Sequence, residues 1–192
     1  MPTANGSPSI DRGRPSFAST VGVRPSSAST LTGIEIEEFG GNDVARQTVI
    51  TFTNTVVAMT DGTTNGSIGA IPLYTLPQGH IGIKGVVTRL TAARVGTAIT
   101  AGTTIKHSVG TAIEATNDTL DSTQANVVAS TNITEGSTTP TIGVNTAYVL
   151  VNGTASAGGL WLNFGVADAG SSGNDSITVN GRVTITWQNN GY

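Results

Sequence analysis

The sequence predicts an all-β fold: a jelly-roll-like β-sandwich that follows an extended N-terminal arm. Apolar and polar residues alternate with a period of two along several segments, as expected of strands that bury one face. Turn signals such as Asp61-Gly62 separate these segments, and no segment has the 3.6-residue apolar period of an amphipathic helix. We therefore expect an arm over residues 1–32 and one β-sandwich domain over residues 33–192.

The arm differs in composition from the rest of the chain. Residues 1–32 are rich in Ser, Pro, Gly and Thr, and they bury too little apolar surface to offset the entropy of ordering. Three arginines against a single aspartate make the arm basic, whereas the whole chain has a net charge of -3. The arm is either a floppy terminus or a segment that orders on a partner. In the second case the contact residues are Arg12, Arg14, Phe17 and Arg24.

A short acidic strand is expected directly after the arm. Over residues 34–38, Ile34 and Ile36 alternate with Glu35 and Glu37. Glutamates on the outer face of such a strand protect a sheet edge from unwanted pairing. We therefore expect this strand at an edge.

The next segments predict longer strands. Residues 47–58 carry threonines on one face and four apolar residues on the other, which are Ile50, Phe52, Val56 and Ala58. Residues 71–77 are extended, but Pro72 and Pro77 restrict them to a sheet edge or to the start of a strand. Residues 81–90 are partly apolar on both faces, which predicts a strand well inside a sheet.

Residues 92–147 carry a weaker pattern. We expect a strand over residues 104–109 and a loop over residues 137–140. Between them the chain is polar, with a short helical turn expected near Asp118 and Asp121.

The pattern becomes clear again in the last third of the chain. A strand that ends at Asn152 turns either Tyr148 and Leu150 or Val149 and Val151 inward. In the following strand the residues of the two faces alternate. One face carries Leu160, Leu162, Phe164 and Val166, and the other carries Trp161, Asn163 and Gly165. A polar loop is expected over residues 168–175.

The closing segment allows two interpretations, because Asn180-Gly181 is a strong hairpin signal. A two-residue hairpin there would place Arg182 and Thr184 on the apolar face. A continuous strand, with Gly181 as a bend or a bulge, keeps every apolar residue on one face, so we prefer it. The expected core residues of this strand are Ile177, Val179, Val183, Ile185 and Trp187.

The sequence offers little that supports catalysis or metal binding. The chain has no cysteine, which excludes disulfides and thiolate ligands. Its two histidines, His80 and His107, have no further ligands at the spacing that a zinc site needs. A lone histidine on a strand is usually a surface residue or a hydrogen-bonded core residue. There is no nucleophile elbow and no phosphate-binding glycine motif. We therefore expect no enzyme activity and no cofactor.

The polar loop over residues 168–175 contains candidate ligands for a metal ion. Asp168, Asn174 and Asp175 cluster within eight or so residues and could supply oxygen ligands to calcium. Their spacing fits no calcium motif, so turn capping is the favoured interpretation.

Charge is sparse, which bears on the kind of partner. Only 11% of residues are charged, against about a quarter in an ordinary globular protein. Neutral hydroxyls and amides cost less to desolvate than ions, so such a surface suits burial against other protein.

No apolar run is long enough to span a membrane, and residues 1–30 lack the apolar block of a secretory signal. We expect no membrane association and no specific nucleic-acid binding, because only the arm is basic.

Three segments carry a resemblance. Residues 71–81, residues 159–164 and the stretch from Asp168 to Trp187 resemble, in this order, a group of small decoration (cement) proteins of the heads of tailed, mostly short-tailed, bacteriophages. The resemblance covers about residues 45–192, and the arm has no matching motif.

The resemblance implies a function that the residues alone do not reveal. It implies a β-sandwich without a cofactor that assembles as a homo-oligomer, a trimer or a dimer, on the exterior of the capsid. The partner is then the major capsid protein, and the protein is made in the host cytoplasm and ends in the virion. The alternative is a receptor- or glycan-binding module of a phage fibre or tail, for which Trp161 is the candidate contact residue.

Overall fold

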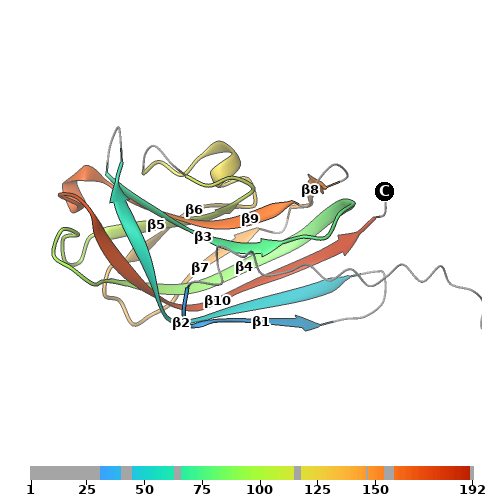
Figure 1. Ribbon diagram of the computed structural model, residues 1–192, viewed down its shortest axis with the longest axis horizontal. Helices are drawn as coiled ribbons and strands as arrows, with labels where there is room; N and C mark the ends of the chain where they lie inside the picture. Colours follow the sequence, from blue (N-terminus) through green and yellow to red (C-terminus); the bar gives the residue numbers. More distant parts are fainter. Residues whose placement is uncertain are drawn as a thin grey trace, which may run out of the picture.

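The computed structural model describes residues 31–39, 45–62, 66–114, 118–145, 147–153 and 158–190. They contain ten strands, all paired in antiparallel fashion, and no α-helix. The prediction of an all-β fold is confirmed. The sheet curls over so that its two halves face each other as two layers (Figure 1).

The first layer, here named sheet B, holds the longest strands. Across it the order is β1, β2, β10, β4, and then β7 and β8, which both pair with β4. The strands are β1 (Ile34–Phe39), β2 (Arg46–Asp61), β10 (Asp175–Asn189), β4 (His80–Arg94), β7 (Thr141–Asn145) and β8 (Val149–Asn152). The edge position expected for the acidic strand is confirmed, since β1 pairs with β2 alone among the described strands.

The second layer, here named sheet A, runs in the order β3, β9, β5, β6. Its strands are β3 (Ser67–Thr75), β9 (Gly159–Val166), β5 (Thr104–Gly110) and β6 (Val128–Thr134). The far end of β2 joins the two layers, because Thr60 and Asp61 pair with Ile68 and Ser67 of β3.

The core lies between the two layers and is built from branched aliphatic and aromatic side chains. The five core residues expected on the closing strand lie on β10 and have no exposed surface: Ile177, Val179, Val183, Ile185 and Trp187. On β9 the inward set is also as expected, with Leu160, Leu162, Phe164 and Val166 buried. Hydrophobic burial of this kind is the main stabilising contribution to the fold.

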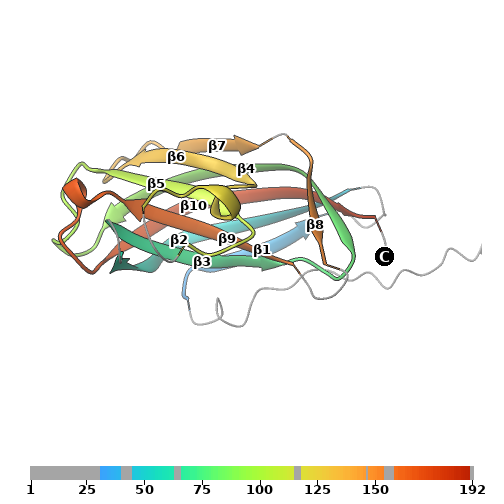
Figure 2. The same ribbon diagram turned by 90° about the horizontal axis from the view of Figure 1, so that it is seen from above.

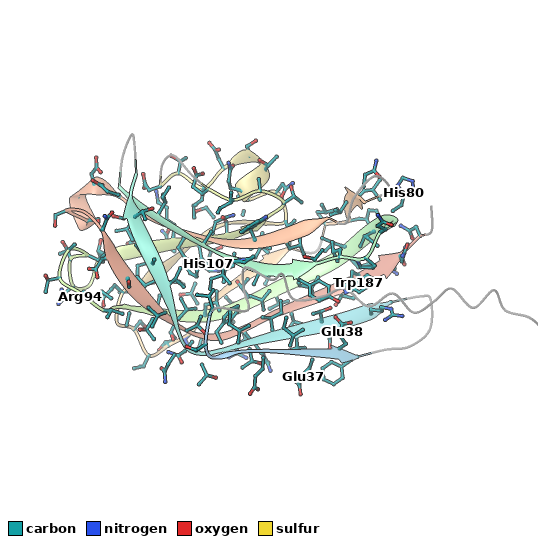
Figure 3. The ribbon with its side chains drawn as sticks, viewed as in Figure 1. Glu37, Glu38, His80, Arg94, His107 and Trp187 are labelled. Carbon is teal, nitrogen blue, oxygen red and sulfur yellow. The ribbon has the colours of Figure 1, made fainter. Side chains whose placement is uncertain are left out.

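A polar contact fastens the edge strand β1 to both layers. The Glu38 carboxylate accepts hydrogen bonds from the hydroxyls of Tyr74 on β3 and Thr48 on β2. Thr48 in turn accepts a hydrogen bond of 2.9 Å from the indole N–H of Trp187. Figure 3 shows Glu38 and Trp187 at the same end of the sandwich, while Glu37 points away from it.

The closing segment is one continuous strand, as preferred, with a register shift between Val179 and Gly181. The shift places two residues of β2, Thr53 and Asn54, opposite the single residue Asn180 of β10. This arrangement is a β-bulge, with the extra residue in β2. The expectation that Val56 and Ala58 share a face with Ile50 and Phe52 was wrong, because the bulge reverses the alternation. Ile50 and Phe52 are buried, but beyond the bulge Val57 and Met59 point inward and Val56 is exposed.

The central strand β4 contains a second bulge. Thr186 pairs with Gly85 and Trp187 pairs with Ile83, so Lys84 is the extra residue. Strand β4 is paired along both sides, which confirms the interior position expected for residues 81–90. Past the bulge the inward residues are Val86, Thr88 and Leu90, and Val87 faces outward.

The proline-containing segment lies where the sequence requires. At Pro72 strand β3 pairs with β9 on one side and with no described strand on the other, and the register shifts there. Pro77 follows the end of the strand. Both placements avoid a missing ladder hydrogen bond.

Other local expectations have mixed outcomes. The strand over 104–109 and the loop over 137–140 are confirmed, and the expected helical turn is a 3₁₀ turn, Ser122–Gln124, that follows Asp121. On β8, Val151 is buried and Leu150 is exposed, which selects the second of the two alternatives. Strands β6 and β7 were not expected.

Candidate functional site

The two outer faces of the sandwich differ. Residues 111–114 and 118–127 cover the outer face of sheet A, and Figure 2 shows the turn at Ser122–Gln124 above β5 and β9. Asn163, on the outward side of β9, is fully buried beneath it. Its side-chain amide donates 3.0 Å hydrogen bonds to the carbonyls of Ala112 and Gln124, and its oxygen accepts one from the Glu114 N–H.

Two glycines allow this covering segment to lie close to the sheet. A Cβ on Gly110 would collide with the backbone of Thr123 and Gln124, and one on Gly165 would press on the backbone of Asp118. An ion pair of 2.7 Å between Lys106 and Asp118 adds a fastening at the margin. The chain thus closes one outer face of the sandwich with its own backbone.

The outer face of sheet B has no such cover among the described residues. We name it the open face, formed by the outward side chains of β1, β2, β10, β4, β7 and β8. Seven apolar side chains on it are between 38% and 57% exposed: Phe39, Val56, Val87, Ile142, Val144, Tyr148 and Leu150. Exposed apolar side chains gathered on one face indicate a contact surface.

The strand register fixes how the open face is arranged. In one row across the sheet, Glu35, Thr51, Arg182, Arg89 and Ile142 are consecutive cross-strand partners. The next row contains Glu37, Val49, Thr184, Val87 and Val144. Directly paired residues share a face, so the acids gather over β1 and the arginines over β10 and β4.

A shallow hollow lies at the centre of the open face. Its volume is about 320 Å³, and its lining comprises Gln47, Val49, Val87, Arg89, Arg182 and Thr184. Small neutral side chains form its middle and two guanidinium groups form one side. It fits a protruding side chain of a partner better than it fits an enclosed small molecule.

The two arginines are cross-strand partners with the same charge. Like charges directly opposite each other are unfavourable in a sheet. Among the described residues neither Arg89 nor Arg182 takes part in an ion pair, and the ion pair of the described part joins Lys106 to Asp118. An acidic group brought to this face would therefore relieve a repulsion as well as make an attraction.

The two histidines lie in different settings. His80 is half-buried at the start of β4, whereas His107 on β5 is buried between the layers (Figure 3). The Nε2 atom of His107 lies 2.8 Å from Oγ1 of Thr88 on β4 in a hydrogen bond between the sheets. Burial lowers the pKa of His107 to about 4, partly offset by the backbone of Thr131. His107 is thus a hydrogen-bonded core residue, as expected of a lone strand histidine.

The acidic loop uses its oxygens to hold backbone. The Asp175 carboxylate accepts hydrogen bonds from the N–H groups of Gly96 and Ile99, at 2.7 and 2.8 Å, and these bonds lower its pKa against the opposing effect of desolvation. Asn174 accepts one from Asp61, and Asp168 accepts one from Gly66. These are the capping roles favoured from the sequence, and the described residues contain no group of three acids or histidines placed to share a metal ion.

Of the remaining candidates, only Trp161 falls within the described residues, and it lies away from the open face. Trp161 is partly buried on the outer side of sheet A, where it pairs with Pro72 and Gly110. The arm residues Arg12, Arg14, Phe17 and Arg24 lie outside the described residues. No helix within the described ranges is long and apolar enough to cross a membrane.

The sequence did not reveal the open face. Neither Arg89 nor Arg182 stands out in the chain, because their proximity depends on the register between β4 and β10. A signal was present in the alternation itself. Val87 and Arg89 share a parity within β4, and Arg182 lies on the polar parity of β10.

Comparisons with known proteins give weak likenesses. No protein-family model matches the chain, and no curated protein matches it. A chain of the cyanophage Pam1 capsid asymmetric unit is similar at 17% identity and a TM-score of 0.35, covering 82% of this chain and 86% of that one. The enzymatically active domain of tailspike protein 4 of bacteriophage CBA120 is similar at 14% identity and a TM-score of 0.29. That match covers 80% of this chain and 18% of the tailspike chain. Likenesses at this level establish no shared function.

Proposed function

We propose that this chain is a structural protein of a virus particle, a decoration protein on the outside of a bacteriophage head, and not an enzyme. The observation that carries the proposal is the contrast between its two outer faces. One is covered by residues 111–114 and 118–127, and the other presents exposed apolar and hydroxyl side chains around a hollow. A sandwich of this kind suits a subunit held between other subunits.

The sparse charge of the chain supports the same proposal. With 11% charged residues, most of the surface consists of neutral groups that are inexpensive to desolvate. A decoration protein stabilises a head by burying area across the seams between neighbouring capsomers. A stable contact buries about 1,600 Å². Many copies on one particle multiply the effect of each contact by avidity.

Within this proposal the arm is the part that binds the major capsid protein. It is basic on an acidic chain, and Arg12, Arg14 and Arg24 supply charge while Phe17 supplies an apolar anchor. Fully extended, 30 residues reach on the order of 100 Å, which is far enough to cross from one subunit to the next. The resemblance of residues 45–192 to head decoration proteins agrees with this role for the whole molecule.

Deletion of residues 1–30 tests the proposal. The deletion ends there because Leu31 packs against the core and the Gly33 carbonyl accepts a hydrogen bond from Thr53. The shortened chain should keep its thermal unfolding transition but fail to co-sediment with undecorated heads of its phage or to protect them from heat. A matched variant, Arg12→Gln, Arg14→Gln and Arg24→Gln, separates charge from length and should bind weakly. Full binding and protection by the shortened chain would show that the arm is not the anchor.

Glycan binding by a fibre or tail is the alternative function. It requires an accessible aromatic platform, and Trp161 is partly buried beside the covered face. The copy number per particle distinguishes the two, since decoration proteins are present in far more copies than fibre tips. A low copy number at the tail would overturn the decoration proposal.

A further inference from the structure

We infer that the open face binds the open face of a second copy of this chain across a two-fold axis, with Glu35 of each copy against the partner's Arg89. The inference rests on the proposed function only in treating the open face as a contact surface.

The charges of the open face are arranged for contact with themselves. Glu35 and Glu37 lie over β1 at one side, and Arg89 and Arg182 lie over β4 and β10 toward the other. A two-fold interface brings the same patch of both copies together, so an acid on one side of the patch meets a base only if that base lies on the other side. A face with acids on one side and bases on the other meets this condition.

The register shows where the axis must run. An axis parallel to the strands, between β2 and β10, would place the partner's β1 over β4 and the partner's β2 over β10. Glu35, Thr51, Arg182 and Arg89 belong to one row, so Glu35 then lies over the partner's Arg89 and Thr51 over the partner's Arg182. The same operation repeats the pair at the symmetry-related position, which gives two such pairs in each dimer.

The two Glu35–Arg89 pairs offset like-charge contacts within each copy, and the Arg182 side chains of the two copies lie on either side of the axis. The paired Arg89 and Arg182 repel each other, and Glu35 and Glu37 are two residues apart on the same side of β1. Among the described residues none of the four takes part in an ion pair. In the next row the side chains beside the axis are small and neutral, with Val49 facing the partner's Thr184, and in the first row each Arg182 lies over the partner's Thr51.

The open face is large enough for a stable dimer. The four strands that face the partner have 6, 16, 15 and 15 residues, and at a rise of about 3.3 Å per residue and a spacing of about 4.8 Å they cover roughly 800 Å². A standard interface buries about 800 Å² on each partner. The exposed Val87 supplies apolar area beside the charged pair, and Ile142 and Val144 of β7 border the contact.

Charge exchange in the full-length chain tests the inference by sedimentation equilibrium. The wild-type chain should be a dimer that dissociates as salt is raised. Glu35→Arg and Arg89→Glu should each raise the Kd for dimerisation about tenfold or more, since each introduces like charges at two positions. The double variant Glu35→Arg/Arg89→Glu should restore the Kd to within about threefold. Asp121→Lys, a charge reversal at the turn on the opposite side of the sandwich, should change nothing.

Each contrary result overturns the inference. A wild-type chain that is monomeric at every concentration excludes the dimer, and single variants that dimerise normally exclude the open face. A double variant that fails to recover excludes the Glu35–Arg89 pair. Deletion of residues 1–30 should leave the dimer intact. If the deletion abolishes the dimer, then the arm, and not the open face of a second copy, holds the two chains together. Because no heads are present in these measurements, failure of the dimer and failure of decoration are separate results.

Discussion

At the scale of single residues, His107 shows how burial alone can make stability depend on pH. Its ring lies between the two sheets, bonded to Thr88, where a charged imidazolium would be poorly solvated. The pKa of His107 therefore falls from its ordinary value of 6.5 to about 4. Between these values the unfolded chain binds a proton that the folded chain does not.

Acid should therefore destabilise the protein through His107. Stability rises with pH wherever the unfolded state binds more protons, so this contribution is complete above pH 6.5 and is lost as pH falls toward 4. We expect a loss of roughly 2–3 kcal/mol between pH 7 and pH 4.5, measured by urea unfolding at each pH. His107→Gln should lower stability at pH 7 but remove this pH dependence. His80→Gln serves as the matched control, and an unchanged slope in His107→Gln would refute the assignment.

At the scale of elements, the bulge that joins β2 and β10 decides which residues reach the core. Asn54 has a left-handed backbone (φ 50°), and its N–H donates a 2.7 Å hydrogen bond to the side chain of Asn180. Gly181 has φ 124°, and a Cβ there would collide with the Arg89 carbonyl of the neighbouring strand. Here glycine is needed both for its backbone conformation and for the close approach of β4.

Replacement of this glycine should be costly. Gly181→Ala combines an unfavourable φ with a backbone collision, and we expect it to lower the free energy of unfolding by about 2–4 kcal/mol in urea titrations. Gly102→Ala is the matched control, because Gly102 also has a positive φ (72°) but open space around it. Gly102→Ala should lower the free energy of unfolding by about 1 kcal/mol. Equal losses in the two variants would show that the collision contributes nothing.

The same elements show what sequence patterns can and cannot predict. β9 was predictable because its apolar residues alternate without interruption. β2 was predicted correctly up to Phe52, and the parity then failed because the bulge depends on a partner strand far away in the sequence.

Strands β6 and β7 escaped prediction for a related reason. In β7 the apolar Ile142 and Val144 face solvent, and the inward residue is Gly143, which lies against Thr88. In β6 the two buried residues, Val128 and Ile133, are five positions apart, so no period of two is visible. The open face was hidden likewise, because it arises from register across five strands.

At the scale of the whole molecule, the topology places the last strand at the centre. β10 is paired along both sides, with β2 from the beginning of the domain and with β4. Sheet B cannot form until the C-terminal part of the chain is available. Such non-local pairing is typical of slow-folding β proteins, because loop-closure entropy is lost before the contacts form.

Removal of β10 should therefore abolish the fold rather than shorten it. Five residues on it have no exposed surface: Ile177, Val179, Val183, Ile185 and Trp187. At about 2 kcal/mol for each buried side chain, their loss approaches 10 kcal/mol, which is comparable to the total stability of a domain. A chain that ends at Asn174 should show no cooperative transition in calorimetry or circular dichroism, whereas the chain lacking residues 1–30 should unfold cooperatively. A cooperative transition in the chain ending at Asn174 would mean that sheet A folds alone, and that the two layers are separate units rather than one curled sheet.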